Sequence, residues 1–286
     1  MKIVSFLGGL GNQMFQYSFY KFLGHYFQDV KADLSGFTDY SLHNGYELDR
    51  IFNIKMEEPS LLERKLYNHT NREWLVRKLR RIYRLKNAYY EEQKPFEFDD
   101  SITKDNSSLR YWGYWQNHKY TEPIQDILRN DFRFVKPLAG KNLNISYELE
   151  NQNSIGIHIR RGDYVSHPLF ENIGSIEYYA NAIHYLKSTV TDAQFYIFSN
   201  DIDWCKRNIS EKNSTFVNWN LGIDSYLDMQ LMSLCKHNII SNSSFSWWAA
   251  WLNENPGKIV ISPSKWVNDP NINYGRGIIP QNWITV

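Results

Sequence analysis

The stretch IGIHIRRGDY, residues 155–164, decides the fold because it runs from a buried strand into a charged loop. Side chains two residues apart on a strand share a face, so His158 and Arg160 should point one way and Arg161 the other. Guanidinium groups are planar forks of donors that match phosphate oxygens two at a time. We therefore expect Arg160 to bind a phosphate at the carboxyl end of the strand. Structural ion pairs of both arginines with Asp163 are the alternative.

Strands and helices alternate throughout the C-terminal half of the chain. Strands are expected at residues 154–159, 194–199, 215–218, 238–241 and 258–262, and helices at 176–190, 204–208, 226–235 and 244–252. Such alternation predicts a mainly parallel sheet whose ligands bind beyond the carboxyl ends of the strands. Residues 137–150 are polar and irregular and are interpreted as a linker. We therefore divide the chain into two α/β domains, residues 1–150 and 151–286.

Further polar residues fall at the same expected edge of this sheet. Asn200 and Asp201 follow one strand, Asp228 lies near the start of a helix, and Ser243 and Ser244 open another helix. Free backbone N–H groups and the helix dipole favour an anion such as a diphosphate at a helix start. Serines that only cap their helix are the alternative explanation for the last pair.

The chain opens MKIVSFLGGLGNQMFQYSFYKFL, residues 1–23, a strand that runs through glycines into a helix. Dinucleotide-binding domains begin in this way, and Asp33 stands about twenty residues on, where their ribose-binding carboxylate is found. The third glycine of that fingerprint is replaced by Met14, however, and the amides Asn12 and Gln13 precede it. The match to a dinucleotide site is therefore weak.

An aromatic segment, residues 109–116 (LRYWGYWQ), is expected to be a strand of the N-terminal domain. Its four rings belong to Tyr111, Trp112, Tyr114 and Trp115. They surround Gly113, and a glycine within a strand leaves space for another group to approach. Rings of this kind are flat platforms for sugars, so we expect them to line a sugar site, with core packing as the alternative.

Residues 61–86 are strongly basic, with apolar residues at helical spacing among the cations. The whole chain carries a formal charge of only +1, so any attraction to an anionic partner is local. We interpret the segment as an ordinary helix with a solvated charged face, and a basic amphipathic helix that lies on an anionic membrane surface is the alternative. The chain has no recognised nucleic-acid-binding motif, so no nucleic-acid partner is expected.

The two cysteines, Cys205 and Cys235, are too few for a disulfide scaffold and are expected to be free thiols. No histidine or cysteine cluster has metal-ligand spacing. No apolar stretch approaches the roughly 20 residues that a transmembrane helix needs. We expect a cytoplasmic protein, and peripheral contact with the inner face of the membrane through residues 61–86 is the alternative left open.

Five motifs together resemble the bacterial α-1,2-fucosyltransferases of glycosyltransferase family 11. They are GGLGNQMFQY (residues 8–17), HIRRGDY (158–164), FSND (198–201), DMQLMSLCKHNIISNSSFSWWAAWL (228–252) and IIPQNW (278–283). The resemblance spans both halves of the chain. It implies a two-domain GT-B-like fold with a Rossmann-like C-terminal half that binds GDP-β-L-fucose. It also implies inverting transfer to the 2-hydroxyl of a terminal β-galactoside, on an oligosaccharide or lipid-linked glycan, without a metal or other cofactor.

The motifs also resemble, more distantly, those of the core α-1,6-fucosyltransferases and the protein O-fucosyltransferases, which implies a role for each residue. On the donor side these are His158 and Asp228 for the guanine, Arg160 with Arg161 in support for the pyrophosphate, Ser243 and Ser244 for phosphate, and Asn200 and Asp201 along the nucleotide pocket. On the acceptor side, Asn12 matches the glycine loop that faces the fucose and acceptor in the O-fucosyltransferases. Gln13 and the aromatic residues Tyr111, Trp112 and Trp115 are the expected acceptor contacts.

In an inverting displacement the negative charge appears on the departing phosphate, where Arg160 and the helix-opening serines can stabilise it. Asp201-Ile202-Asp203 resembles a metal-binding pair, but the cationic motif makes a metal redundant. Asp163 is the first candidate for a base that takes the acceptor proton. The core fucosyltransferases use a glutamate where this chain has Pro168, so the alternative is that Asn12 only orients the hydroxyl.

Two other classes of protein share some of these features. A non-catalytic glycan-binding module would use Trp112, Trp115, Trp247 and Trp248 as stacking platforms, and a membrane-surface or nucleic-acid-binding protein would use residues 61–86. A glycan-binding module has no use for HIRRGD next to a nucleotide pocket, and the chain shows no recognised binding fold of the other class. Detection of GDP binding separates the transferase from both.

Overall fold

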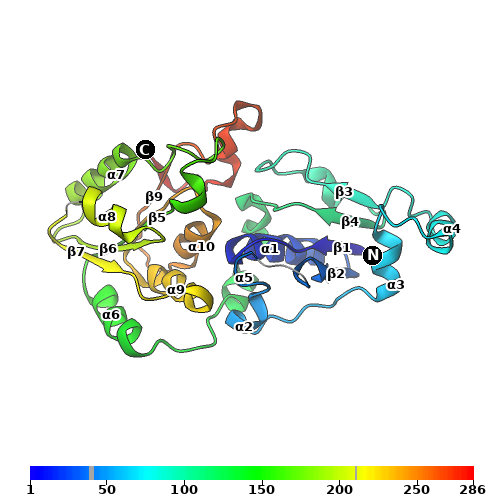
Figure 1. The fold of residues 1–286 in the computed structure, drawn as a ribbon, viewed down its shortest axis with the longest axis horizontal. Helices are drawn as coiled ribbons and strands as arrows, with labels where there is room; N and C mark the ends of the chain where they lie inside the picture. Colours follow the sequence, from blue (N-terminus) through cyan, green and yellow to red (C-terminus); the bar gives the residue numbers. More distant parts are fainter. Residues whose placement is uncertain (39–41, 210) are drawn as a thin grey trace. The chain divides into compact units, whose positions relative to one another are not determined.

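A computed structural model describes residues 1–38, 42–209 and 211–286, except for the side chain of Asp163. The chain divides into two compact units, Met1–Arg133 and Phe134–Val286 (Figure 1). The division falls earlier than residue 150 because the expected linker is wrong. Residues Gly140–Asn151 form helix α6, which packs on β5 and α9 of the second unit.

Unit 1 is built on a parallel four-stranded sheet in the order β2-β1-β4-β3. Its strands are β1 (Lys2–Ser5), β2 (Val30–Asp33), β3 (Tyr89–Glu91) and β4 (Leu109–Trp112). Its α-helices are α1 (Leu10–Tyr26), α2 (Leu48–Phe52), α3 (Leu61–Tyr67), α4 (Trp74–Ile82) and α5 (Gln125–Asp131). Short 3₁₀ turns lie at η1 (Ser35–Phe37), η2 (Asp100–Thr103), η3 (His118–Tyr120) and η4 (Glu122–Ile124).

Aromatic side chains form much of the core of unit 1. Phe19 of α1 stacks on Trp115 with ring centroids 4.0 Å apart, and Tyr111 and Tyr120 meet Phe19 edge-on. Aromatic pairs of this kind add to the stabilisation that burial of their apolar area provides. The many rings of α1 therefore hold the helix against β4 and the segment that follows it.

Unit 2 is built on a parallel six-stranded sheet in the order β10-β9-β8-β5-β6-β7. Its strands are β5 (Ser154–Ile159), β6 (Gln194–Ser199), β7 (Ser214–Val217), β8 (His237–Ile239), β9 (Val260–Ser262) and β10 (Ile284–Thr285). Its α-helices are α6, α7 (Ile176–Thr189), α8 (Ile202–Asn208), α9 (Tyr226–Leu234) and α10 (Ser244–Leu252). Short 3₁₀ segments lie at η5 (Gly162–Tyr164), η6 (Gly222–Asp224) and η7 (Pro270–Ile278). The predicted series of strands and helices is confirmed.

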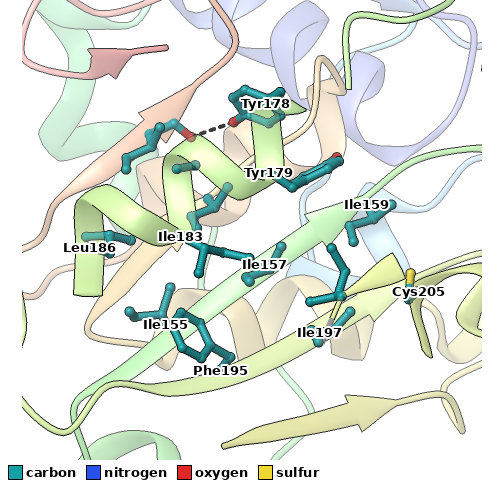
Figure 2. Close-up of a cluster of buried hydrophobic side chains, with 14 residues drawn as sticks. Ile155, Ile157, Ile159, Tyr178, Tyr179, Ile183, Leu186, Phe195, Ile197 and Cys205 are labelled. Atoms are coloured by element: carbon teal, nitrogen blue, oxygen red, sulfur yellow. Dashed lines mark hydrogen bonds between the residues drawn. The ribbon is translucent and has the colours of Figure 1, made fainter. Parts of the chain in front are cut away.

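Every residue of β5 is buried because helices cover both faces of the sheet. On one face the isoleucines of β5 pack under Ile183 and Leu186 of α7 (Figure 2). The Tyr178 hydroxyl of the same helix donates to the Ile261 carbonyl of β9 at 3.2 Å. On the other face Gly156 leaves room for Cys235, whose Sγ would lie 3.0 Å from a Cβ at that position. Both cysteines are free, as predicted, and both are buried.

Candidate functional site

The polar residues of unit 2 gather where β5 and β6 end level with each other, because Ile159 pairs with Ser199 in the parallel register. A cavity of about 370 Å³ opens at this edge of the sheet. Its walls are formed by Arg160, Arg161, Tyr164, Val165, Phe170, Asn172, Gly174, Ser175, Ile176, Glu177, Trp204 and Asn242. Ligands of open parallel sheets bind at such an edge, so this cavity is the candidate site.

His158 is buried on the face of β5 that α10 covers. Its Nδ1 is 2.9 Å from the Ser241 hydroxyl, and its ring lies 5.6 Å from the Phe245 ring. Burial, with a smaller contribution from the Arg160 charge, lowers the pKa of His158 to about 3. The imidazole is therefore neutral near pH 7, and it can hydrogen-bond a ligand but supplies no positive charge.

Arg160 and Arg161 have different surroundings although both line the cavity. Arg161 donates from Nε to Asp201 Oδ2 at 3.1 Å, and its guanidinium lies 4.1 Å from the Trp204 ring centre. Arg160 lies over the Tyr164 ring at 5.4 Å. The prediction that the two side chains take opposite sides of the sheet is wrong, because the strand ends at Ile159 and Arg161 leaves extended geometry, with ψ at −99°.

Asn200 and Asp201 hold the arginine loop in place. Asn200 Oδ1 accepts from the Arg161 backbone N–H at 2.9 Å. Asp201 Oδ1 caps α8 by accepting from the Trp204 N–H at 3.1 Å, while its other oxygen pairs with Arg161. Gly162, with φ at +36°, passes so close that a Cβ there would lie 2.5 Å from Asn200 Nδ2. The two residues therefore hold the loop whose arginines line the cavity, and any contact of their own with a nucleotide stays a prediction.

Ser243 occupies the N-cap position of α10 and is buried, but its side chain makes no capping hydrogen bond. The alternative that this serine only caps its helix is therefore wrong. Ser244 is the first helical residue and is partly buried. The loop before them is fixed by Asn242, whose Nδ2 donates to the Trp266 carbonyl at 3.1 Å. The start of α10 thus lies beside the cavity, whose wall includes Asn242.

Asp228 lies in the first turn of α9 and accepts from Asn220 Nδ2 at 2.7 Å. Burial raises the pKa of Asp228 to about 7, and the Asn220 hydrogen bond opposes this shift. Asn220 also exchanges hydrogen bonds with Asn142 of α6, at 2.8 and 3.1 Å, and Trp219 Nε1 donates to the same Asn142 Oδ1 at 2.7 Å. A buried amide network therefore fixes the carboxylate.

The sequence does not predict this network, because the polar character of residues 137–150 indicates a linker and not a helix. The buried residues of α6 are Asn142, Ile145, Ser146 and Leu149. Their spacing of three and four residues is a helical signal, but two of the four are polar, so hydrophobic periodicity does not reveal it.

In unit 1 the loop between β1 and α1 is closed by side-chain amides. Gln13 is fully buried: its Nε2 donates to the Gly8 and Gly45 carbonyls at 2.9 and 2.8 Å, and its Oε1 accepts from the Glu47 N–H at 2.9 Å. Gln13 therefore has a structural role, which contradicts the expected acceptor contact. Asn12 is partly buried, and its Oδ1 accepts from Gln116 Nε2 at 2.7 Å. Gln116 thus orients the Asn12 amide, a role that no sequence pattern indicated.

The aromatic residues of 109–116 divide between core and surface. Tyr111 and Trp115 are 0% and 1% exposed and pack against α1, so the prediction that they contact the acceptor is wrong for both. Trp112 and Tyr114 are 37% and 42% exposed and stay candidates for a sugar wall. Alternation along β4 turns Tyr111 inward and Trp112 outward. The strand ends at Trp112, short of the expected residue 116, and Trp115 reaches the core from the segment beyond it, where its φ is +57°.

Trp247 and Trp248 of α10 are also fully buried and cannot act as stacking platforms in this structure. Asp33 does not have the setting of a ribose-binding carboxylate. It is buried and pairs with Arg110 at 2.8 Å and with Arg64 at 3.5 Å, so its charge is balanced inside unit 1.

The side chain of Asp163 lies outside the described residues, so its role as a base stays a prediction. Within the described residues, no three His, Cys, Asp or Glu side chains gather as metal ligands do. No helix of the described chain combines the length and the apolar composition that a membrane span requires.

The model of glycosyl transferase family 11 matches residues 2–286. The alpha-1,2-colitosyltransferase of Escherichia coli is 34% identical over 98% of this chain and 96% of its own length. The O-antigen biosynthesis glycosyltransferase WbnK of Escherichia coli is 32% identical over 91% of this chain and 92% of its own. Among solved structures, the fucosyltransferase NodZ from Bradyrhizobium aligns with a TM-score of 0.52 and 12% identity, over 87% of this chain and 92% of that one. The expected GT-B-like fold is confirmed.

Proposed function

The chain belongs to glycosyl transferase family 11, and we propose that it transfers L-fucose from GDP-β-L-fucose to the 2-hydroxyl of a terminal β-galactoside. The observation that carries this proposal is the family match over residues 2–286. Unit 2 supports it, because two guanidinium groups, Arg160 and Arg161, and Asn242, which precedes the start of α10, line a cavity at the end of β5. The acceptor belongs to an O-antigen, a capsule or another oligosaccharide.

The nucleotide binds in unit 2 under this proposal. Arg160 and the start of α10, with Ser243 and Ser244, bind the diphosphate, because a guanidinium fork and free helix N–H groups both favour phosphate oxygens. Asp228 accepts hydrogen bonds from the N–H groups of the guanine edge. His158 adds a neutral hydrogen-bonding group. Arg161, held by Asp201 and Trp204, supports the loop on which Arg160 lies.

The transfer is proposed to be a direct displacement with inversion. The acceptor hydroxyl forms the new bond to the anomeric carbon as the bond to GDP breaks, and the electron pair of that bond leaves with the diphosphate. Arg160 then faces more negative charge than in the ground state, so its contribution is larger in the transition state. The hydroxyl proton passes to Asp163 or, in the alternative, is lost late to phosphate or water while Asn12 orients the hydroxyl.

A second candidate donor is GDP-colitose. The 34% identical relative is named as an alpha-1,2-colitosyltransferase, and colitose differs from fucose by the absence of the 3-hydroxyl. A site that hydrogen-bonds this hydroxyl would discriminate strongly against the deoxy sugar, whereas a site that only leaves space for it would accept both.

Two measurements test the proposal in sequence. Calorimetry with GDP comes first, and failure to bind GDP would reject every version of the donor assignment. An acceptor array is then incubated with GDP-fucose and, in parallel, with GDP-colitose. Transfer to the 2-hydroxyl of terminal β-galactose is expected. Transfer only to N-acetylglucosamine or to peptide hydroxyls would overturn the acceptor assignment, and transfer of colitose alone would overturn the donor.

A further inference from the structure

Helix α4 has more apolar surface than its packing in unit 1 uses. Its inner face is anchored by Val76, 3% exposed, in a cluster with Ile3 and Leu66. On its other side Trp74, Leu75 and Ile82 are 69%, 63% and 61% exposed. Scattered surface apolar residues are common, but three on one short helix form a second apolar face that the fold leaves uncovered.

The exposed side of α4 is also strongly basic. Trp74, Lys78 and Ile82 follow one another at intervals of four residues and so form one row along the helix. Arg77 and Arg81 border this row. Among the described residues, these two arginines and Lys78 have no acidic partner within ion-pair distance. Lys78 instead lies over the Trp74 ring at 5.4 Å.

The local charge differs sharply from that of the whole chain. Residues 61–86 contain nine basic and two acidic side chains, a net charge of +7, whereas the whole chain carries +1. The excess positive charge is therefore concentrated in the segment that contains α3 and α4, which lie side by side in unit 1 (Figure 1).

We propose that the outer face of α4, defined as Trp74, Leu75, Arg77, Lys78, Arg81 and Ile82, docks on the surface of an anionic phospholipid bilayer. The helix would lie in the plane of the interface, with its apolar side chains among the upper acyl chains and its cations at the headgroups. Tryptophan favours this boundary, and a lysine stem can extend along apolar surface while its ammonium stays in water.

The apolar residues distinguish a bilayer from a nucleic acid as the occupant. A nucleic-acid surface is read mainly by cations and polar groups, so exposed leucine and isoleucine among the cations would gain little from it. An anionic bilayer, in contrast, can interact with both the apolar side chains and the cations of α4. The inference does not depend on the identity of the sugar or of the nucleotide, and its test requires no catalytic activity.

The test is co-sedimentation of the full chain with vesicles of phosphatidylcholine alone and of phosphatidylcholine with phosphatidylglycerol. Binding is expected only to the anionic vesicles and should weaken as salt is raised. The triple change Arg77→Glu, Lys78→Glu, Arg81→Glu should reduce binding about a hundredfold or more, since each cation near the surface contributes roughly fivefold. The triple change Trp74→Ser, Leu75→Ser, Ile82→Ser should reduce binding at least about tenfold with its charges intact.

A matched control places the same charge reversal elsewhere. Lys206, Arg207 and Lys212 are exposed in unit 2, and their change to glutamate alters the net charge equally. This control should retain more vesicle binding than the α4 charge variant, and thermal melts check that each variant is folded. Equal binding to neutral vesicles, an equal loss in the control, or no loss in the serine variant would overturn the proposal. So would tight binding to RNA or DNA by a chain that ignores the vesicles.

Discussion

The loop after β1 in unit 1 and the loop after β5 in unit 2 have different roles. In unit 1, β1 runs through Gly8 and Gly9 into α1, and the side-chain amides of buried glutamines hydrogen-bond the backbone around this loop. Gln13 bonds three backbone groups, and Gln16 joins the Leu7 N–H to the Gly113 carbonyl, both at 3.0 Å. In unit 2, β5 ends at a cavity lined by Arg160 and Arg161. A glycine loop after a strand is thus not by itself an anion site.

The charged groups near the two loops have different surroundings. Within unit 1 the buried carboxylate of Asp33 pairs with Arg110 and Arg64, and Arg64 also pairs with Glu58. In unit 2 the Asp201 carboxylate pairs with Arg161, while His158 is neutral and Asp228 has a raised pKa. The comparison leads us to assign the nucleotide to unit 2 and a structural role to most of the unit 1 loop.

The sharpest test of this contrast is Arg160→Lys, which keeps the charge and removes the fork. We expect turnover to fall about a hundredfold or more, on the order of 3 kcal/mol, because a single ammonium cannot reproduce two parallel hydrogen bonds to the developing phosphate charge. GDP affinity should fall less, since other groups share ground-state binding. The measurement is the turnover number and the GDP dissociation constant.

Arg161→Lys is the matched control at the neighbouring position. Arg161 pairs with Asp201 and stacks on Trp204, so its change should lower the melting temperature more than it lowers turnover. If Arg161→Lys alone abolishes turnover in a folded protein, the roles of the two arginines must be exchanged.

On the side of unit 1, Gln13→Ala should destabilise the fold without weakening GDP binding. The change leaves two carbonyls and one N–H buried without their partner, and we expect the free energy of unfolding to fall by about 2 to 3 kcal/mol. Urea denaturation and GDP calorimetry are the measurements. The control is Gln93→Ala, because Gln93 is exposed and, among the described residues, its side chain bonds only the Glu91 carbonyl. A loss of GDP affinity with unchanged stability would break the comparison and return the nucleotide to the first loop.

The pH dependence of GDP binding should follow Asp228 and not His158. Guanine N–H groups need an ionised carboxylate as acceptor, and the pKa of Asp228 is about 7 in the free protein. Below that pH the carboxyl is protonated, so GDP affinity should fall by up to about tenfold per pH unit. The pKa of His158 is about 3, so this residue contributes nothing between pH 5 and 8. Calorimetry across that range measures the midpoint.

Ionisation of the GDP diphosphate also makes GDP affinity depend on pH. The variant Asp228→Asn keeps that contribution and removes the one from the carboxyl group. Only the part that disappears in Asp228→Asn belongs to the carboxyl group, and survival of the whole dependence would contradict the assignment. The pH dependence of folding stability is an independent test of the raised pKa of Asp228. Because folding raises the pKa of Asp228 from 3.8, the folded state holds its proton more tightly, and this group makes the fold less stable as pH rises from about 4 to 7.

The sequence predicted the scaffold of unit 2 well because its strands are short apolar runs between clear helical segments, as in 154–159. Its failures have physical causes. Two of the buried residues of helix α6, Asn142 and Ser146, are polar, so hydrophobic periodicity does not predict this helix. Only the packing in the folded structure distinguishes the buried rings of Tyr111 and Trp115 from the exposed rings of Trp112 and Tyr114. Likewise, the neighbouring sequence does not indicate that the Gln13 side chain hydrogen-bonds the backbone of Gly45 and Glu47, which lie more than thirty residues away.

The smallest expected effect is that of a chelator, which should leave turnover unchanged. Asp201-Ile202-Asp203 is the one pair that resembles a metal motif in the sequence, and Asp201 is occupied, since one oxygen caps α8 and the other pairs with Arg161. Arg160 and the start of α10 supply the positive potential that a divalent ion would otherwise provide. Turnover is measured in excess EDTA, then after Mn²⁺ or Mg²⁺ is restored, with Asp203→Asn in parallel. A loss in EDTA that either ion reverses, together with an inactive Asp203→Asn, would give this pair a metal and remove the electrostatic distinction drawn between the two units.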